Sequence, residues 1–196
     1  MKTIEERLDI LEEKMRQESF RNNTGLGNEV GYYVFDYEPH QELIVRERVR
    51  NLSDSNTVLK FGYQLKLYDM YELILELLEG EGVLEDLRDL EEEEGTEYVF
   101  QSISDVLRFD DQESLIIHHI MENTPDDSVV FLTGVGKCYP ILRSHKILNN
   151  LHQVMDHCPV VLFFPGQYNG DSLNIFGESG GDKNENYYRA FPLVER

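Results

Sequence analysis

The sequence has few of the features by which secreted or membrane proteins are recognised. It contains no tryptophan, and its two cysteines, Cys138 and Cys158, are too few for the disulfide framework of a small secreted domain. Apolar runs such as 159–165 fall far short of the roughly 20 residues that span a bilayer. The charged N-terminus has no apolar segment of the kind found in a signal peptide. These absences predict a reduced, soluble, cytoplasmic protein.

Basic side chains are also scarce. The chain has 18 Lys and Arg against 38 Asp and Glu, which gives a net charge of −20. Because DNA binding draws much of its affinity from counterions that Lys and Arg displace, direct DNA binding by this chain is not expected. Its 196 residues, 40% of them hydrophobic, suffice for one domain with its own core.

The negative charge is concentrated in residues 69–97, which hold 13 acidic residues and one basic residue, Arg88. The simplest interpretation is a solvated helix face that keeps the protein in solution. A docking surface for a basic partner, or a surface that imitates nucleic acid, is the functional alternative.

Predicted strands and helices alternate along the chain, which indicates an α/β fold. We expect a single domain with a mostly parallel sheet flanked by helices, an N-terminal helix, and a C-terminal hairpin or edge strands. Residues 1–24 are predicted as an N-terminal amphipathic helix and residues 25–196 as the α/β domain. The expected strands are 31–37, 57–67, 128–134 and 160–164, with short strand-like segments at 167–178 and 187–194. The expected helices are 3–19, 38–52, 68–79, 83–93, 111–123 and 139–157, the last with Pro140 in its first turn.

Ligands of open α/β sheets bind outside the carboxyl ends of the strands, so the loops at those ends are the first places to inspect. The loop with Gly134, Gly136 and Lys137 resembles a phosphate loop. A Walker A loop, however, needs a glycine five residues before Gly136 and a Ser or Thr after Lys137, where Phe131 and Cys138 stand. A tight strand-to-helix turn is therefore preferred over nucleotide hydrolysis, with binding of another anion as the alternative.

Other chemical signals are weak. His145 and His152 share a helix face but lack a CxxC or HxxxH neighbourhood, so no metal and no cofactor are predicted. Cys138, which follows Lys137, is the only thiol with a reason for a lowered pKa. Asp36 and Glu38 are expected to cap the helix that follows them, with a role as metal ligand or base left open.

Three arginines, Arg46, Arg143 and Arg189, lie in apolar contexts, where arginine commonly binds a carboxylate through two hydrogen bonds. Internal pairing with Asp36 or Glu42 is the preferred interpretation, and binding of a partner or ligand anion is the alternative. The candidate binding residues, chosen by motif and position, are Asp36, Glu42, Arg46, Gly134, Gly136, Lys137, Pro140, Arg143, His145, Asn149, Asn150, Gly166, Tyr168, Gly170, Tyr188 and Arg189. None is assigned a catalytic role.

Four segments of the sequence resemble the BrxB family, the small B component of BREX (bacteriophage exclusion) defence systems, first described as a domain of unknown function. They are 35-FDYEPHQELIVRERV-49, 132-LTGVGKCYPILRSHKILNNL-151, 159-PVVLFFPGQYNGDSLNIFG-177 and 186-NYYRAFPL-193. The resemblance implies an antiviral protein that acts with other BREX components, among them a methyltransferase, an ATPase and the phosphatase-like PglZ. The resemblance implies PglZ as the closest partner, and no catalytic residue that could be transferred.

Together these observations predict a non-catalytic assembly or adaptor component of a BREX phage-defence complex that works through protein–protein interaction, with no membrane and no direct DNA contact. Two alternatives remain. One is an α/β enzyme or anion-binding protein with a site at the strand ends around Asp36, Lys137 and Arg143. The other is an acidic regulator that imitates nucleic acid through residues 69–97. Oligomeric state is open.

Overall fold

The fold is built on a mostly parallel sheet. The computed structural model describes residues 2–21, 31–54, 56–109, 113–176 and 190–196. The parallel strands lie in the order β2-β3-β4-β1-β6, and a short strand, β5, pairs antiparallel with the end of β4. The six strands of the described residues are β1 Tyr32–Tyr37, β2 Gln64–Asp69, β3 Ser128–Thr133, β4 Val160–Tyr168, β5 Leu173–Ile175 and β6 Phe191–Pro192. The predicted single-domain α/β architecture is confirmed.

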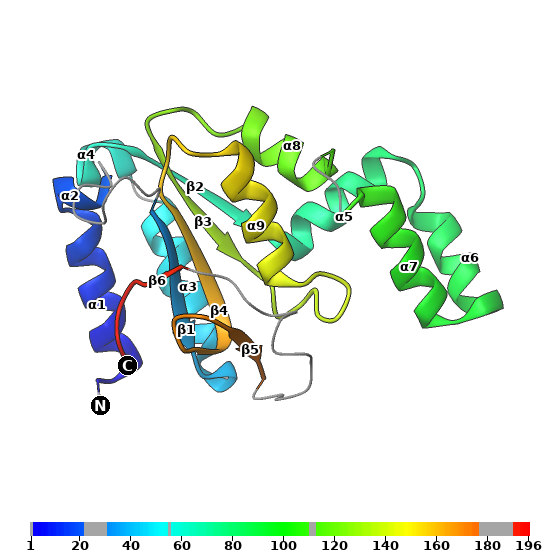
Figure 1. Ribbon diagram of the computed structural model, residues 1–196, viewed down its shortest axis with the longest axis horizontal. Helices are drawn as coiled ribbons and strands as arrows, with labels where there is room; N and C mark the ends of the chain where they lie inside the picture. Colours follow the sequence, from blue (N-terminus) through cyan, green and yellow to red (C-terminus); the bar gives the residue numbers. More distant parts are fainter. Residues whose placement is uncertain (1, 22–30, 55, 110–112, 177–189) are drawn as a thin grey trace.

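One face of the sheet is covered by α1 (Ile4–Met15), α2 (Glu18–Arg21), α3 (Glu42–Asp54) and α4 (Thr57–Phe61). The helix α1 begins at a capping box in which the Thr3 hydroxyl accepts from the Glu6 N–H and Glu6 accepts from the Thr3 N–H. Its apolar stripe, with Leu8, Leu11 and Met15 fully buried, packs into the same core as α3 and the sheet. The N-terminal helix therefore docks on its own domain (Figure 1).

The opposite face carries α5 (Met70–Gly80), α8 (Leu115–Glu122) and α9 (Ser144–Val154). The helices α6 (Leu84–Glu94) and α7 (Thr96–Leu107) pack on each other and on α5, and Figure 1 shows them extending away from the sheet. Most of the acidic segment 69–97 thus lies on α5 and on this outlying pair. Of the helices on this side, α7 was not predicted, although Val99, Ile103 and Leu107 recur at helical spacing.

The strand predicted at 57–67 is present only in its second part. Residues 57–61 form α4, and β2 begins only at Gln64. The Asn56 side chain caps α4 by accepting from the Leu59 N–H, and Gly62 ends it in the left-handed region at φ +81°. These two helix signals outweigh the apolar alternation that suggested a strand.

The helix predicted over 139–157 begins later than expected. Arg143 has extended backbone angles, φ −95° and ψ 119°, so α9 starts at Ser144. Residues before it form turns, in which the Leu142 N–H donates to the Cys138 carbonyl at 3.0 Å. Pro140 consequently lies ahead of the helix rather than in its first turn.

The C-terminal part agrees with the predicted hairpin and edge strand. β4 runs on to Tyr168 and pairs with β5, while β6 lies at the edge of the sheet beside β1. Residues 177–189, which include part of the second predicted segment, lie outside the described residues. In the described part of the chain, no helix is both long and apolar enough to cross a membrane.

Candidate functional site

The carboxyl ends of β1, β2, β3 and β4 meet at one edge of the sheet, and two of the cavities formed by the described residues open there. A cavity of about 270 Å³ lies between α3 and the ends of β2 and β3, and an open one of about 510 Å³ lies between the end of β4 and residues 192–196. The structure brings seven predicted residues to these cavities: Glu42, Arg46, Gly134 and Lys137 line the first, and Asp36, Tyr168 and Gly170 line the second.

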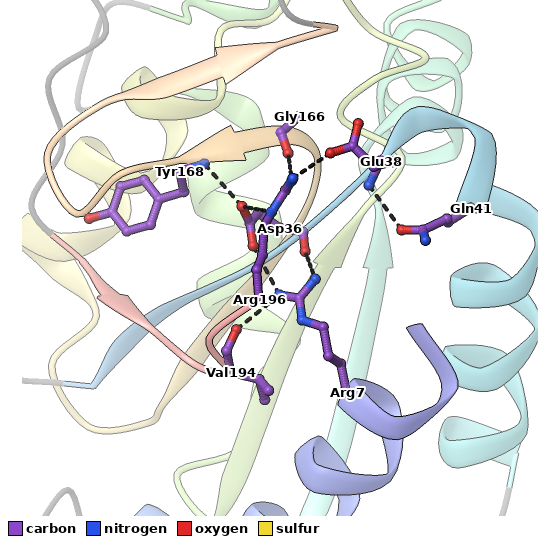
Figure 2. Close-up of polar contacts among 8 residues, drawn as sticks. All are labelled: Arg7, Asp36, Glu38, Gln41, Gly166, Tyr168, Val194 and Arg196. Carbon is purple, nitrogen blue, oxygen red and sulfur yellow. Dashed lines mark hydrogen bonds and ion pairs between the residues drawn. The ribbon is translucent and has the colours of Figure 1, made fainter. Parts of the chain in front are cut away.

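Asp36 is the centre of a buried polar cluster (Figure 2). The Arg7 guanidinium donates to its Oδ1 at 3.0 Å and to its backbone carbonyl at 2.6 Å, and Arg196 Nε donates to Oδ2 at 2.9 Å. Arg7 also donates to the Val194 carbonyl at 2.9 Å. Two arginines from opposite ends of the chain therefore meet at the end of β1.

Arg196 binds further groups around this cluster. Its guanidinium contacts the Glu38 carboxylate and donates to the Gly166 carbonyl at 2.5 Å. Burial alone would lower the pKa of Arg196, but the charges of Asp36 and Glu38 outweigh it and raise that pKa. Burial dominates at Arg7 and lowers its pKa.

The prediction that Asp36 caps the following helix is wrong, because both its carboxylate oxygens face the arginines and the Tyr168 N–H. Glu38 does stand at a helix start: its N–H donates to Gln41 Oε1 at 3.1 Å at the beginning of the 3₁₀ helix η1 (Pro39–Gln41). The cluster ties α1, β1, β4 and the C-terminal residues together.

The smaller cavity has an apolar floor and a charged rim. Val45, Val49 and Phe163 are buried beneath it. On the rim, the Tyr37 hydroxyl donates to Glu42 at 2.5 Å, and Glu42 lies 3.7 Å from Arg46. Burial, with the Glu42 charge, raises the pKa of Tyr37 well above its usual value, so the phenol stays protonated.

The Arg46–Glu42 ion pair confirms the internal pairing expected for this arginine. The Arg46 side chain is nevertheless 43% exposed, so the pair is open to water and weak.

The turn after β3 is held by contacts within the chain. Gly134 has φ +73°, and a Cβ there would lie 2.2 Å from Asp69 Oδ1. Lys137 Nζ binds Asp69 Oδ2 at 2.7 Å, and Asp69 in turn caps α5 by accepting from the Tyr71 N–H at 3.1 Å. The expected tight turn is present, and its lysine pairs with a carboxylate of this chain.

The remaining candidates are dispersed. Arg143, His145, Asn149 and Asn150 lie at or in α9, on the other face of the sheet, and line neither cavity. Asn150 donates to the Phe109 carbonyl at 3.1 Å. Gly136 and Gly166 are packed closely against Pro165 and Asn174, respectively. Tyr188 and Arg189 lie outside the described residues. A role in binding for any of the residues in this paragraph stays a prediction.

The Tyr168 hydroxyl makes hydrogen bonds with backbone groups of Gly170 and Ala190. It lies 2.7 Å from the Gly170 carbonyl and 2.8 Å from the Ala190 carbonyl, and it accepts from the Ala190 N–H at 2.8 Å. The side chain thereby fastens the segment that leads into β6 to the end of β4.

The one reason in the sequence for a lowered pKa at Cys138, its neighbour Lys137, is outweighed in the structure. Burial, with the nearby Asp69 charge, raises the pKa of Cys138 to about 12, and Lys137 only partly offsets this. At pH 8 about one thiol in ten thousand would be ionised.

We expect iodoacetamide at pH 8 to leave Cys138 unmodified in the folded protein and to label it promptly in urea, as read by peptide mass spectrometry. Rapid labelling without urea would contradict this burial.

The raised pKa also predicts the direction of a pH effect. The unfolded thiol loses its proton above about pH 9 while the folded thiol keeps it up to about 12, so Cys138 contributes stability that falls as the pH rises through that interval. Thermal unfolding at pH 8 and pH 10, in wild type and in Cys138→Ser, measures this contribution.

Three arginines at this edge were not predicted: Arg7, Arg50 and Arg196. Arg7 and Arg196 form the Asp36 cluster, and Arg50 lines the smaller cavity. Among the described residues, no group of three or more His, Cys, Asp or Glu side chains is placed to hold a metal ion.

Comparison with known proteins identifies the family. The family model described as "BREX protein BrxB" matches residues 66–193, from β2 to β6. The chain belongs to the BrxB family. A BrxB protein from Bacillus cereus (strain H3081.97), named "BREX protein BrxB", is 43% identical over 198 residues and covers all of both chains. One from Escherichia coli O9:H4 (strain HS), with the same name, is 30% identical over 97% of this chain and 92% of its own length. No solved structure matches.

The predicted resemblance to the BrxB family is thus confirmed. The family model begins inside β2, whereas the Bacillus cereus BrxB protein matches the whole chain. The full-length match therefore also spans α1, β1 and α3, which supply Arg7, Asp36 and the arginines beside the smaller cavity.

Proposed function

We propose that this chain is a non-catalytic assembly component of a BREX phage-defence complex and acts by binding other BREX proteins, with PglZ as the first partner to test. Its relatives in Bacillus cereus and Escherichia coli are named as BREX proteins, which supports a place in such a system. The resemblance of the sequence to the BrxB family supplies PglZ as the expected partner.

The observation that carries the proposal is that the buried and partly buried carboxylates at the strand ends form ion pairs within this chain. This is the edge at which α/β enzymes place catalytic groups. Here the Asp36 carboxylate binds Arg7 and Arg196, and the Asp69 carboxylate binds Lys137 and caps α5. These acidic groups join parts of the same chain, which favours a scaffold over a catalyst.

Co-purification tests the proposal. The tagged chain is expressed with its neighbouring BREX proteins and captured at physiological salt and at about three times that concentration. We expect one partner, PglZ first, to remain bound at both, because an interface with an apolar centre loses little affinity when salt screens its charges. Failure to capture any BREX protein would refute the assembly role.

Capture that disappears at high salt would instead favour the acidic regulator, since α6 and α7 extend from the body and carry much of the acidic segment. Replacement of Glu91, Glu92, Glu93 and Glu94 by glutamine separates the two functions. It should leave an assembly interface centred elsewhere unchanged, and it should abolish binding through an acidic face.

A further inference from the structure

The helix α3 presents one side to solvent beside the smaller cavity. Leu43, Arg46 and Arg50 stand at positions i, i+3 and i+7, so they lie along one side of the helix. Leu43 is 71% exposed and its neighbour Ile44 is 42% exposed. Leu43 thus places a large apolar side chain on the same accessible side of α3 as the two arginines.

Arg50 differs from the arginine two residues before it. Arg48 pairs with Asp9 at 2.8 Å and with Glu12 at 3.5 Å, which fastens α3 to α1. The Arg50 side chain is exposed and lines the cavity, and it makes no ion pair or side-chain hydrogen bond in the part of the chain that the structure describes. Arg50 and the weakly paired Arg46 together form a cationic patch on α3, in a protein whose net charge is −20.

The cavity between Arg46, Arg50 and β2 is large enough to admit an apolar side chain. Its volume of about 270 Å³ lies near the lower end of the roughly 300–1,000 Å³ of small-molecule sites. Buried apolar residues form its floor, and the largely exposed Glu72 lies on its far rim. Apolar pockets of this kind, beside arginine and rimmed by polar groups, are where protein interfaces concentrate binding energy.

We propose that the cavity and the outer side of α3 dock a segment of another BREX protein in which an apolar side chain enters the cavity and an adjacent carboxylate binds Arg50 and Arg46. This inference rests on the proposed assembly function and names the surface that performs it. An acidic segment would be repelled by most of this protein, above all by α6 and α7. The cationic patch of Arg46 and Arg50 therefore also determines where such a segment binds.

Two variants test the surface after the partner has been captured by the wild-type chain. Arg50→Glu reverses the exposed charge, and Leu43→Asp places a carboxylate in the apolar part of the surface. Arg88→Glu on α6 is the matched control, because Arg88 is also an exposed arginine and lies on the outlying helices. All three positions are exposed, so each variant should unfold within about 2 °C of wild type, since exposed substitutions usually cost little stability.

We expect Arg50→Glu and Leu43→Asp each to weaken the dissociation constant for the captured partner about tenfold or more, and Arg88→Glu to change it less than about twofold. Isothermal titration calorimetry measures the three constants. Wild-type affinity in both α3 variants would overturn the docking surface while leaving the assembly function intact. Absence of any captured partner would refute the assembly function and this inference with it.

Two further outcomes would also overturn the proposal. If the wild-type chain dimerises alone and Arg50→Glu makes it a monomer in size-exclusion chromatography, the occupant of the surface is a second copy. If Arg88→Glu weakens binding as much as Arg50→Glu, the effect reflects net charge rather than this surface.

Discussion

Replacing Asp36 with alanine should lower the free energy of unfolding by about 3–5 kcal/mol, because it leaves a buried guanidinium without its counter-ion. The Arg7 side chain is only 5% exposed and cannot turn to water without moving α1 away from β1. The loss should appear in urea unfolding curves and as a fall in the melting temperature on the order of 10 °C.

Asp9→Ala is the matched control for this prediction. Asp9 also accepts from an arginine, Arg48, at 2.8 Å, but its side chain is 62% exposed. Exposed ion pairs contribute about 0–1 kcal/mol, so the control should lose little stability. Equal losses in the two variants would show that the Asp36 cluster does not hold the ends of the chain to the sheet.

Gly166→Ala should cost about 2–3 kcal/mol, because the added methyl group has no space. A Cβ at Gly166 would lie 2.2 Å from the Asn174 carbonyl oxygen and 2.7 Å from the Phe164 ring. The first contact is with backbone, so β5 must move away from β4, and the Gly166 carbonyl that Arg196 binds moves with it. Urea unfolding measures the cost, and hydrogen exchange at residues 173–175 locates it.

Gly80→Ala provides the control for the same substitution in open space. Gly80 is the last residue of α5, and no atom outside its chain neighbours and the backbone of its own helix lies within 4 Å of the position of its Cβ. Alanine there should leave stability unchanged or raise it by up to about 1 kcal/mol, since alanine favours helix more than glycine does. A loss at Gly166 no larger than the change at Gly80 would mean that β5 is not packed against β4.

Much of the architecture follows from local sequence. The continuous apolar runs at 128–134 and 160–164 identified β3 and β4, because strands buried on both faces need no polar alternation. The residues at which helices and strands begin and end were harder to predict. Thr57–Phe61 has the alternation of a strand, and only its flanking Asn56 and Gly62 indicate a helix.

The candidate site was predicted in part. Its location at the strand ends follows from the alternation of strands and helices, and the glycine turn before Lys137 was recognised from spacing. Arg7 carried a signal that was not used: it falls three residues after Ile4 and four before Leu11, on the buried stripe of α1. Arg196 carried none, because its contact with Asp36 spans 160 residues and depends on the tertiary fold.

The position of β1 in the sheet has a consequence for synthesis of the protein. β1 lies between β4 and β6, and Tyr32 pairs with Val160, so the first strand to be made waits for 128 further residues before its main neighbour exists. At about 5–20 residues per second, translation takes roughly 6–25 s to supply β4. During that interval the segment 32–37, which is buried along its whole length in the folded protein, has neither of its neighbouring strands to pair with, so the edges of the newly made strand stay open.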